Sequence, residues 1–144
     1  MSLERFLQAQ EQGGSYERAL AELKAGEKSS HWMWWIFPQE PREGTSETSR
    51  LYALMEDEAR DYLRHPLLGM RYRECVGVVH GQLCRNGVAP LTLMGGEVDA
   101  KKLGSSLELF LKIAPAGESV FRSQAEAILE VLGEGRDGVT TEDL

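Results

Sequence analysis

The sequence predicts an all-α protein, a single multihelical globular domain of seven or eight short helices. In most segments apolar residues recur with the three- to four-residue period of an amphipathic helix, and glycine, proline or serine separates these segments. No two segments show the alternation that paired strands require. A length of 144 residues with 42 % hydrophobic and 27 % charged residues is typical of a globular domain with its own core. We expect this domain to span residues 1–132, followed by a flexible acidic tail at 133–144.

Two helices are predicted before the first long loop. The first begins near Leu3 and ends at Gly13, and the second has Ser15 as its expected N-cap and Gly26 as its stop. The apolar stripes of both helices follow helical spacing: Leu3, Phe6, Leu7, Gln10, Tyr16, Ala19, Leu20 and Leu23.

A short apolar segment follows, with Ser29 or Ser30 as its expected cap and Pro38 at its end. Six apolar residues in a row fit a buried strand as well as a helix. We favour a helix because no other segment supplies a partner strand. Residues 38–47 then read as a polar loop.

The rest of the chain predicts five further helices and a turn. Leu51 begins one helix, and a charged helix from Glu56 is broken at His65, because the residue before a proline avoids the α region. The longest helix is expected to start at Pro66. The remaining boundaries are a turn at 90–94, a helix from 97 that Pro115 ends, and a last helix over 120–132.

Composition and charge exclude several classes of function. A formal charge of −7 argues against sequence-independent binding of nucleic acid, which needs a basic surface. No apolar stretch approaches the roughly 20 residues that span a bilayer, and the first residues lack the apolar region of a signal peptide. We therefore expect a cytoplasmic protein whose partners are small molecules or proteins, with no membrane and no nucleic acid. The oligomeric state stays open.

The cysteines and histidines predict neither a disulfide nor a metal site. Cys75 and Cys84 lie nine positions apart on one predicted helix. At about 1.5 Å of rise per residue, that separation is too long for a disulfide. His31, His65 and His80 lack metal-binding spacing, so we expect no metal and no cofactor.

The segment from Ser30 to Gln39 is the main candidate for a binding site, since it holds all three tryptophans of the chain. In one interpretation, His31, Trp34 or Trp35, and Gln39 line a pocket for a flat polar ligand such as a nucleobase. In the other, Trp32, Trp35, Ile36 and Phe37 are core residues and His31 is a capping or hydrogen-bonded side chain. Three tryptophans within four residues cannot all face one core, so at least one is expected to be partly exposed.

A second candidate group consists of four polar residues at helical spacing: Asp99, Lys102, Ser105 and Ser106. A lysine beside a serine can activate a nucleophile, and two serines in mid-helix are poor helix formers. The group therefore suggests contacts to phosphate or sugar oxygens, or catalysis. Alternatively, Asp99 caps the helix and pairs with Lys102, while the serines allow close helix packing.

Several segments resemble domain-of-unknown-function family 1810. The first is the run from Leu3 to Gln39, above all the Ser30–Gln39 segment. Four later stretches agree with the family as well: Tyr52–Leu54, Glu58–Gly69, Arg73–Cys75 and Asp99–Phe110. The resemblance covers about Leu3 to Phe110 and implies a small, mainly helical bacterial protein without an assigned activity. Two stretches depart from the family pattern: Glu40-Pro41-Arg42-Glu43-Gly44 after Gln39, and Leu93-Met94-Gly95-Gly96 before the second group.

The sequence alone is compatible with two functions. The first is a binding domain, or a simple hydrolase, for a nucleotide-derived or similar flat polar metabolite, with a concave pocket in which the two groups face each other. The second is a non-catalytic protein-interaction module that uses an exposed aromatic patch.

Overall fold

The computed structural model describes the backbone of residues 3–42 and 46–143, and the side chains of these residues as far as Gly133. Within these ranges the chain forms helices and no strand, which confirms the predicted all-α class. The α-helices are α1 (Glu4–Glu11), α2 (Ser15–Ala25), α3 (Met33–Ile36), α4 (Glu47–Leu51), α5 (Glu56–Arg64), α6 (Leu68–His80), α7 (Pro90–Met94), α8 (Glu97–Ile113) and α9 (Ser119–Asp143). A 3-10 helix, η1 (Gln12–Gly14), lies between α1 and α2, and a π-helix, η2 (Gly81–Arg85), continues α6.

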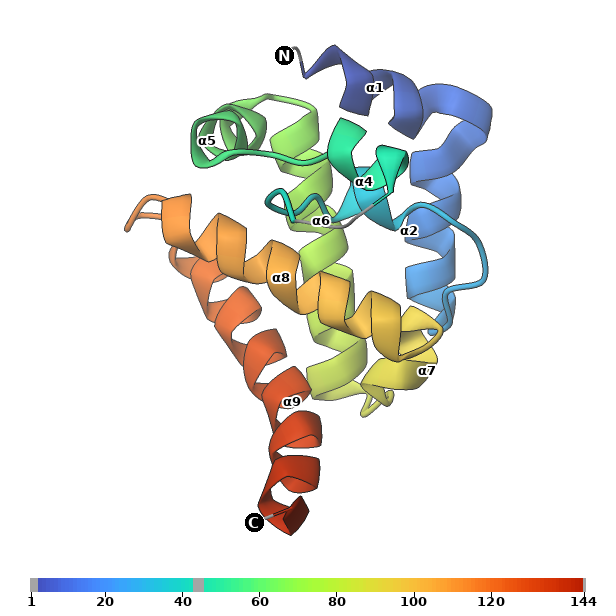
Figure 1. Cartoon of the computed structure of the whole chain (residues 1–144), viewed down its shortest axis with the longest axis vertical. Coiled ribbons are helices and arrows are strands. Elements are labelled where there is room, and N and C mark those ends of the chain that lie inside the picture. The colour runs from blue at the N-terminus through green and yellow to red at the C-terminus, as the bar shows by residue number, and fades with distance from the viewer. Residues whose placement is uncertain (1–2, 43–45, 144) are drawn as a thin grey trace.

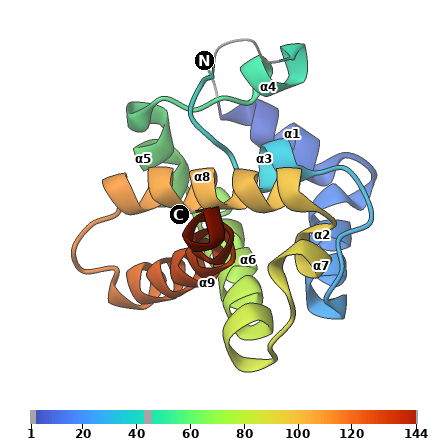
Figure 2. The same cartoon turned by 60° about the horizontal axis from the view of Figure 1, so that its bottom comes forward.

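Helix α6 forms the centre of the fold and packs against α2, α5 and α9. Helix α8 crosses in front of α6 and contacts α3, α5, α7 and α9 (Figure 1). A second view shows α3 beside α8 on the face away from α9 (Figure 2). Helix α3 is thus held against α8, and the tryptophan-rich segment lies beside that helix.

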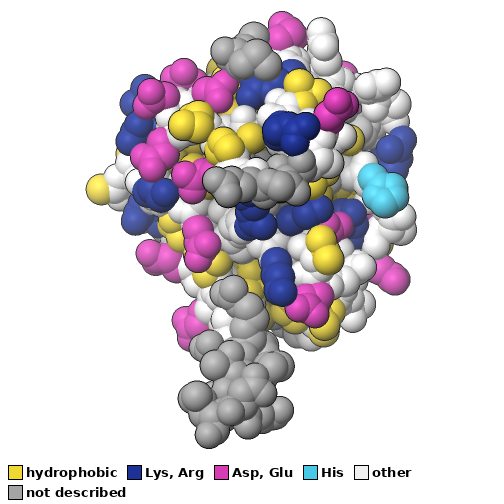
Figure 3. All heavy atoms as spheres, viewed as in Figure 1, with side chains coloured by type: hydrophobic (Ala, Val, Ile, Leu, Met, Phe, Trp, Pro, Cys, Tyr) yellow, Lys and Arg dark blue, Asp and Glu magenta, His cyan; other side chains and the backbone are white. Residues whose placement is uncertain are grey.

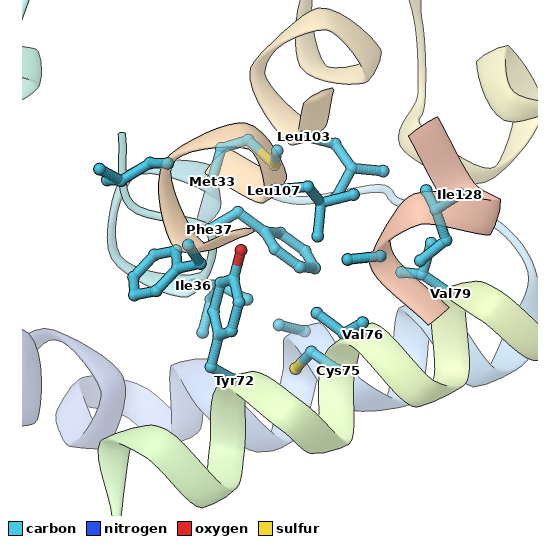
Figure 4. Close-up of a cluster of buried hydrophobic side chains, with 14 of the residues drawn as sticks. Met33, Ile36, Phe37, Tyr72, Cys75, Val76, Val79, Leu103, Leu107 and Ile128 are labelled. Atoms are coloured by element: carbon cyan, nitrogen blue, oxygen red, sulfur yellow. The ribbon is translucent and has the colours of Figure 1, made fainter. Parts of the chain in front are cut away.

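Half of the tryptophan-rich segment belongs to the core. Met33, Ile36 and Phe37 point into a cluster of buried side chains that α6, α8 and α9 complete (Figure 4). Trp32 is also fully buried, at 1 % exposure. The apolar residues of this segment therefore fix α3 in place, and Trp34 and Trp35 are left half-buried.

The predicted serine caps are wrong. Gly14, in a left-handed conformation, precedes α2, and the hydroxyl of Ser15 instead accepts a hydrogen bond from the Trp35 indole at 2.7 Å. Trp32 precedes α3 without a side-chain cap, and Ser29 and Ser30 bond to Glu22. All three serines have partners that lie elsewhere in the fold, and a local sequence pattern does not include these partners.

Several predicted boundaries also shift. Leu51 ends α4 instead of beginning a helix, and α6 begins at Leu68, two residues after Pro66. Residues 90–94 form the short helix α7 and not a turn. Helix α6 continues directly into η2, so the predicted helix extends to Arg85, but α9, with 25 residues, is the longer helix. The flexible tail was predicted for residues 133–144. The side chains after Gly133 lie outside the described part of the chain, so the tail stays a prediction.

The two cysteines have different surroundings. Cys75 is buried, and this burial is the main cause that raises the pKa of its thiol to about 12. Cys84 is exposed, and neither cysteine is in a disulfide. In the described part of the chain, no helix has both the length and the apolar character that crossing a membrane requires.

The loop after α2 is joined to the turn between α7 and α8. The backbone N–H of Lys28 donates to the carbonyl of Leu93 at 2.8 Å. Gly95 has a φ of +76°, and a Cβ at this position would lie 2.9 Å from the carbonyl oxygen of Lys28. The close approach of the two backbones therefore requires glycine.

Replacing Gly95 by alanine should lower the free energy of unfolding more than replacing Gly87. Gly87 has a similar φ of +69°, and a Cβ added there would meet no atom within 4 Å, so Gly87→Ala measures the conformational strain alone. We expect a loss of about 1 kcal/mol for Gly87→Ala and at least about 1 kcal/mol more for Gly95→Ala, by urea unfolding. Equal losses would contradict the close approach.

A thiol reagent at about pH 8 should modify Cys84 quickly and Cys75 only after unfolding, because the thiolate is the reactive form. Burial raises the pKa of Cys75 and also blocks access to it. Mass spectrometry of the labelled peptides in the native and the urea-unfolded protein checks this result. Equal rates at both cysteines in the native protein would show that Cys75 is not enclosed.

Candidate functional site

The carboxylate of Glu22 on α2 holds the loop that leads to the tryptophans. Its Oε1 accepts hydrogen bonds from the backbone N–H groups of Ser29 (2.8 Å) and Ser30 (3.1 Å) and from the Trp32 indole (2.9 Å). Its Oε2 accepts from the Ser30 hydroxyl. Burial raises the pKa of this carboxyl, but the hydrogen bonds outweigh burial and lower the pKa to about 2. Glu22 therefore fixes both the loop and the orientation of Trp32.

Lys28, in the same loop, connects it to α8. Its side chain is only 7 % exposed, and its Nζ lies 2.8 Å from Oδ2 of Asp99. The same ammonium donates to the carbonyl of Ser30 at 2.6 Å and lies 4.8 Å from the centre of the Trp32 ring. A buried ammonium needs such partners, because its desolvation is costly. The ion pair therefore holds Asp99 at a fixed place beside the loop.

Lys102 brings the two groups that the sequence indicates into contact. Its Nζ lies 4.0 Å from the centre of the Trp34 ring, within cation–π distance, and 3.6 Å from Oδ1 of Asp99. Asp99 and Lys102 are one helical turn apart on α8, and Trp34 comes from α3. One carboxylate is thus shared by two ammonium groups beside a half-buried indole.

Ser105 extends this surface along α8. Its hydroxyl accepts a hydrogen bond from the guanidinium of Arg42, which lies in the segment after α3. Lys and Arg side chains gather over the face that α8 crosses (Figure 3). We call the following residues the Trp34–Lys102 cluster: Lys28, Trp34, Arg42, Asp99, Lys102 and Ser105.

Two of the predicted site residues lie away from this cluster. The Trp35 indole donates to Ser15, and its ring packs 5.3 Å from the ring of Tyr52. Ser106 is completely buried, and its hydroxyl lies 2.9 Å from the hydroxyl of Tyr72. Because successive helix positions are about 100° apart, Ser106 faces the core while Ser105 does not. The serine pair is therefore divided between the core and the surface.

The other two, His31 and Gln39, lie on either side of the tryptophans. His31 is exposed and takes part in no hydrogen bond or ion pair among the described residues. Gln39 is only 4 % exposed, and its side-chain Nε2 has no partner in the described part of the chain. A buried donor without an acceptor costs about 1–3 kcal/mol, so this amide stands out from the other buried polar groups.

Sequence reasoning missed three residues that build the site: Glu22, Lys28 and Arg42. Each acts through a partner that is distant in sequence or in an irregular loop, so helical spacing gives no signal for it. Arg42 lies in the stretch after Gln39 that departs from the family pattern, which was the available hint that this loop differs.

A wide hollow lies elsewhere in the molecule, between α6 and the start of α9. It has a volume of roughly 750 Å³ and is lined by residues such as Met70, Arg73 and Val120. Arg73 is paired there with Glu118 through two hydrogen bonds of 3.0 and 2.9 Å. No residue of the Trp34–Lys102 cluster lines this hollow, and the concave pocket expected at the cluster stays a prediction.

Comparisons with known proteins match the chain to a family of unknown function. The family model described as "Protein of unknown function (DUF1810)" matches residues 1–144. The chain is similar to the crystal structure of the conserved hypothetical protein Rv1873 from Mycobacterium tuberculosis, with 36 % sequence identity and a TM-score of 0.76. The match covers 89 % of this chain and 84 % of the other. A search of curated proteins finds no match.

Replacing Glu22 by glutamine should lower the free energy of unfolding by about 1–3 kcal/mol near pH 7, because it removes the charge from several hydrogen bonds. The folded pKa of about 2 is lower than the ordinary value of 4.5. The contribution of Glu22 is therefore complete above the ordinary value and disappears as the pH falls toward the folded pKa.

Urea unfolding of the wild type and Glu22→Gln from neutral to acidic pH checks this expectation. Glu17→Gln, at an exposed position on the same helix, is the matched control and should change stability by less than about 0.5 kcal/mol. A difference between the wild type and Glu22→Gln that does not shrink at acidic pH would rule out the carboxylate as its cause.

Proposed function

We propose that this chain, which belongs to the DUF1810 family of proteins of unknown function, binds a small, flat, polar ligand at the Trp34–Lys102 cluster. The observation that carries the proposal is the 4.0 Å contact between the Lys102 ammonium and the Trp34 ring. It joins two groups that lie nearly 70 positions apart in the sequence and that each pointed to ligand binding. The cytoplasm is the location that we propose for this binding domain.

The chemistry of the contact suits a flat ligand. A half-buried indole offers an apolar face, on which an aromatic ring gains stacking energy of about 1–3 kcal/mol. Lys102 is only 20 % exposed, and its contact with Trp34 keeps an ammonium beside that face. A ligand that carries both a ring and an acceptor atom would stack on Trp34 while Lys102 turns to the acceptor.

The contacts of the two serines support binding more than hydrolysis. An activated serine needs a hydrogen bond to a base, and the partner of the Ser105 hydroxyl is the guanidinium of Arg42, which stays protonated in proteins. Ser106 bonds to the phenol of Tyr72 inside the core. Neither hydroxyl therefore has the geometry of a nucleophile beside a base.

The alternative, a docking module with an exposed aromatic patch, has less support. Trp32 is buried, and Trp34 and Trp35 are half-buried with partners of their own. A patch that docks a protein through aromatic side chains needs them on the surface.

Titration with adenosine 5′-monophosphate should shift the Trp34 indole signal in a ¹H–¹⁵N NMR spectrum, with half-saturation below about 1 mM, that is, about 4 kcal/mol of binding. The indoles of Trp32 and Trp35 are bonded to Glu22 and Ser15, so their signals should move less. Trp34→Leu assigns the signal by removing it and should abolish saturable binding.

Lys101→Ala is the matched control for Lys102→Ala, because Lys101 lies on the same helix but pairs with Glu97 on the surface. We expect Lys102→Ala to weaken binding and Lys101→Ala to leave it unchanged. Shifts confined to the Trp32 or Trp35 signals, or to residues of the α6–α9 hollow, would contradict the proposed site. No saturable shift at any signal would contradict the proposed function.

A further inference from the structure

We infer that the polar end of the ligand is a phosphate monoester, held by Lys102, Ser105 and Arg42 on the surface of α8. This inference rests on the proposed function and names the class of ligand: a flat ring joined to a single phosphate group, of which a nucleoside monophosphate is an example. Three observations support it: the local charge, the geometry of the donors and the position of the indole.

The charges around Asp99 leave a cation available. Two ammonium groups share this carboxylate, so these three side chains carry one positive charge in excess. Lys28 is fixed by two short contacts, 2.8 Å to Asp99 and 2.6 Å to the carbonyl of Ser30. Lys102 is 3.6 Å from the carboxylate and more exposed than Lys28. Lys102 is therefore the ammonium that can change partner when an anion binds.

The donors come from two directions onto one region. Lys102 and Ser105 are three residues apart on α8, which places them on one face, with a rise of about 4.5 Å between them. Arg42 approaches from the segment after α3 and already reaches the hydroxyl of Ser105. The Lys102 ammonium and the Ser105 hydroxyl lie within one turn of α8, and the Arg42 guanidinium meets them there. These donors match the several oxygens of one phosphate, which arginine binds through paired hydrogen bonds.

The position of this surface on α8 favours a monoester over a chain of phosphates. A chain of phosphates is usually bound by a glycine-rich loop at a helix N-terminus, and Lys102 and Ser105 lie in the middle of α8 instead. The Trp34 ring is 4.0 Å from the Lys102 ammonium, so a ring stacked on the indole would have its phosphate at Lys102 without a long linker.

Asp99 then acts as the internal competitor of the ligand. Its carboxylate is the anion that Lys102 faces in this structure, and it repels an incoming phosphate. Replacing Asp99 by asparagine should therefore strengthen phosphate binding, whereas a carboxylate that contacts the ligand would weaken binding when it is removed.

Calorimetric titration of the full chain with adenosine 5′-monophosphate, adenosine and inorganic phosphate tests the inference. We expect the monophosphate to bind at least about tenfold more tightly than adenosine, as one or two charge-assisted hydrogen bonds would give. This preference should disappear in Lys102→Ala and Arg42→Gln, persist in Lys101→Ala, and increase a few-fold in Asp99→Asn. If Asp99→Asn does not fold, because Lys28 is buried against it, loss of the preference in Ser105→Ala provides the second test.

The outcomes separate the two proposals. If adenosine binds as tightly as the monophosphate and Trp34→Leu abolishes both, the phosphate inference is wrong and the proposed function stands. If inorganic phosphate binds as tightly as the monophosphate, the site binds a free anion and the flat ring contributes nothing to binding, so the inferred class of ligand is wrong. If none of the three probes binds, both proposals are wrong.

Discussion

The hydrogen bonds of the Glu22 carboxylate determine how the tryptophan-rich segment enters the core. This side chain accepts from the backbone and hydroxyl of the following loop and from the Trp32 indole, and its pKa is lowered to about 2. The loop would otherwise expose or bury these donors without partners, since it belongs to no regular element. With Trp32 fixed, the helix that follows, α3, directs Met33 and Ile36 into the core. Trp34 of the same helix contacts Lys102 on α8.

The second constraint is the ion pair of Lys28 with Asp99, which joins this loop to α8. Together with Gly95, it brings the α7–α8 turn against the loop backbone. Trp34 and Lys102 meet because both of their elements are held by these contacts. The proposed ligand site therefore depends on the same contacts that join the loop after α2 to α8. Residues such as Lys28 and Asp99 contribute to stability as well as to the proposed binding.

The helical class and most helix positions follow from apolar periodicity and from glycine and proline, and the crowding of three tryptophans predicts that some of them stay partly exposed. Helical spacing also brings Asp99, Lys102 and Ser105 to one face. It fails for Ser106, which spacing alone groups with Lys102 but which bonds to Tyr72 inside the core. Long-range partners such as Arg42 depend on tertiary packing, which no local pattern encodes.

A crystal structure of the chain grown with adenosine 5′-monophosphate tests the central claim most directly. We expect the adenine ring to lie against Trp34 and the phosphate to contact Lys102, Ser105 and Arg42, with Lys102 moved away from Asp99. A nucleotide bound in the hollow between α6 and α9, with the contact between Lys102 and Trp34 unchanged, would contradict the claim.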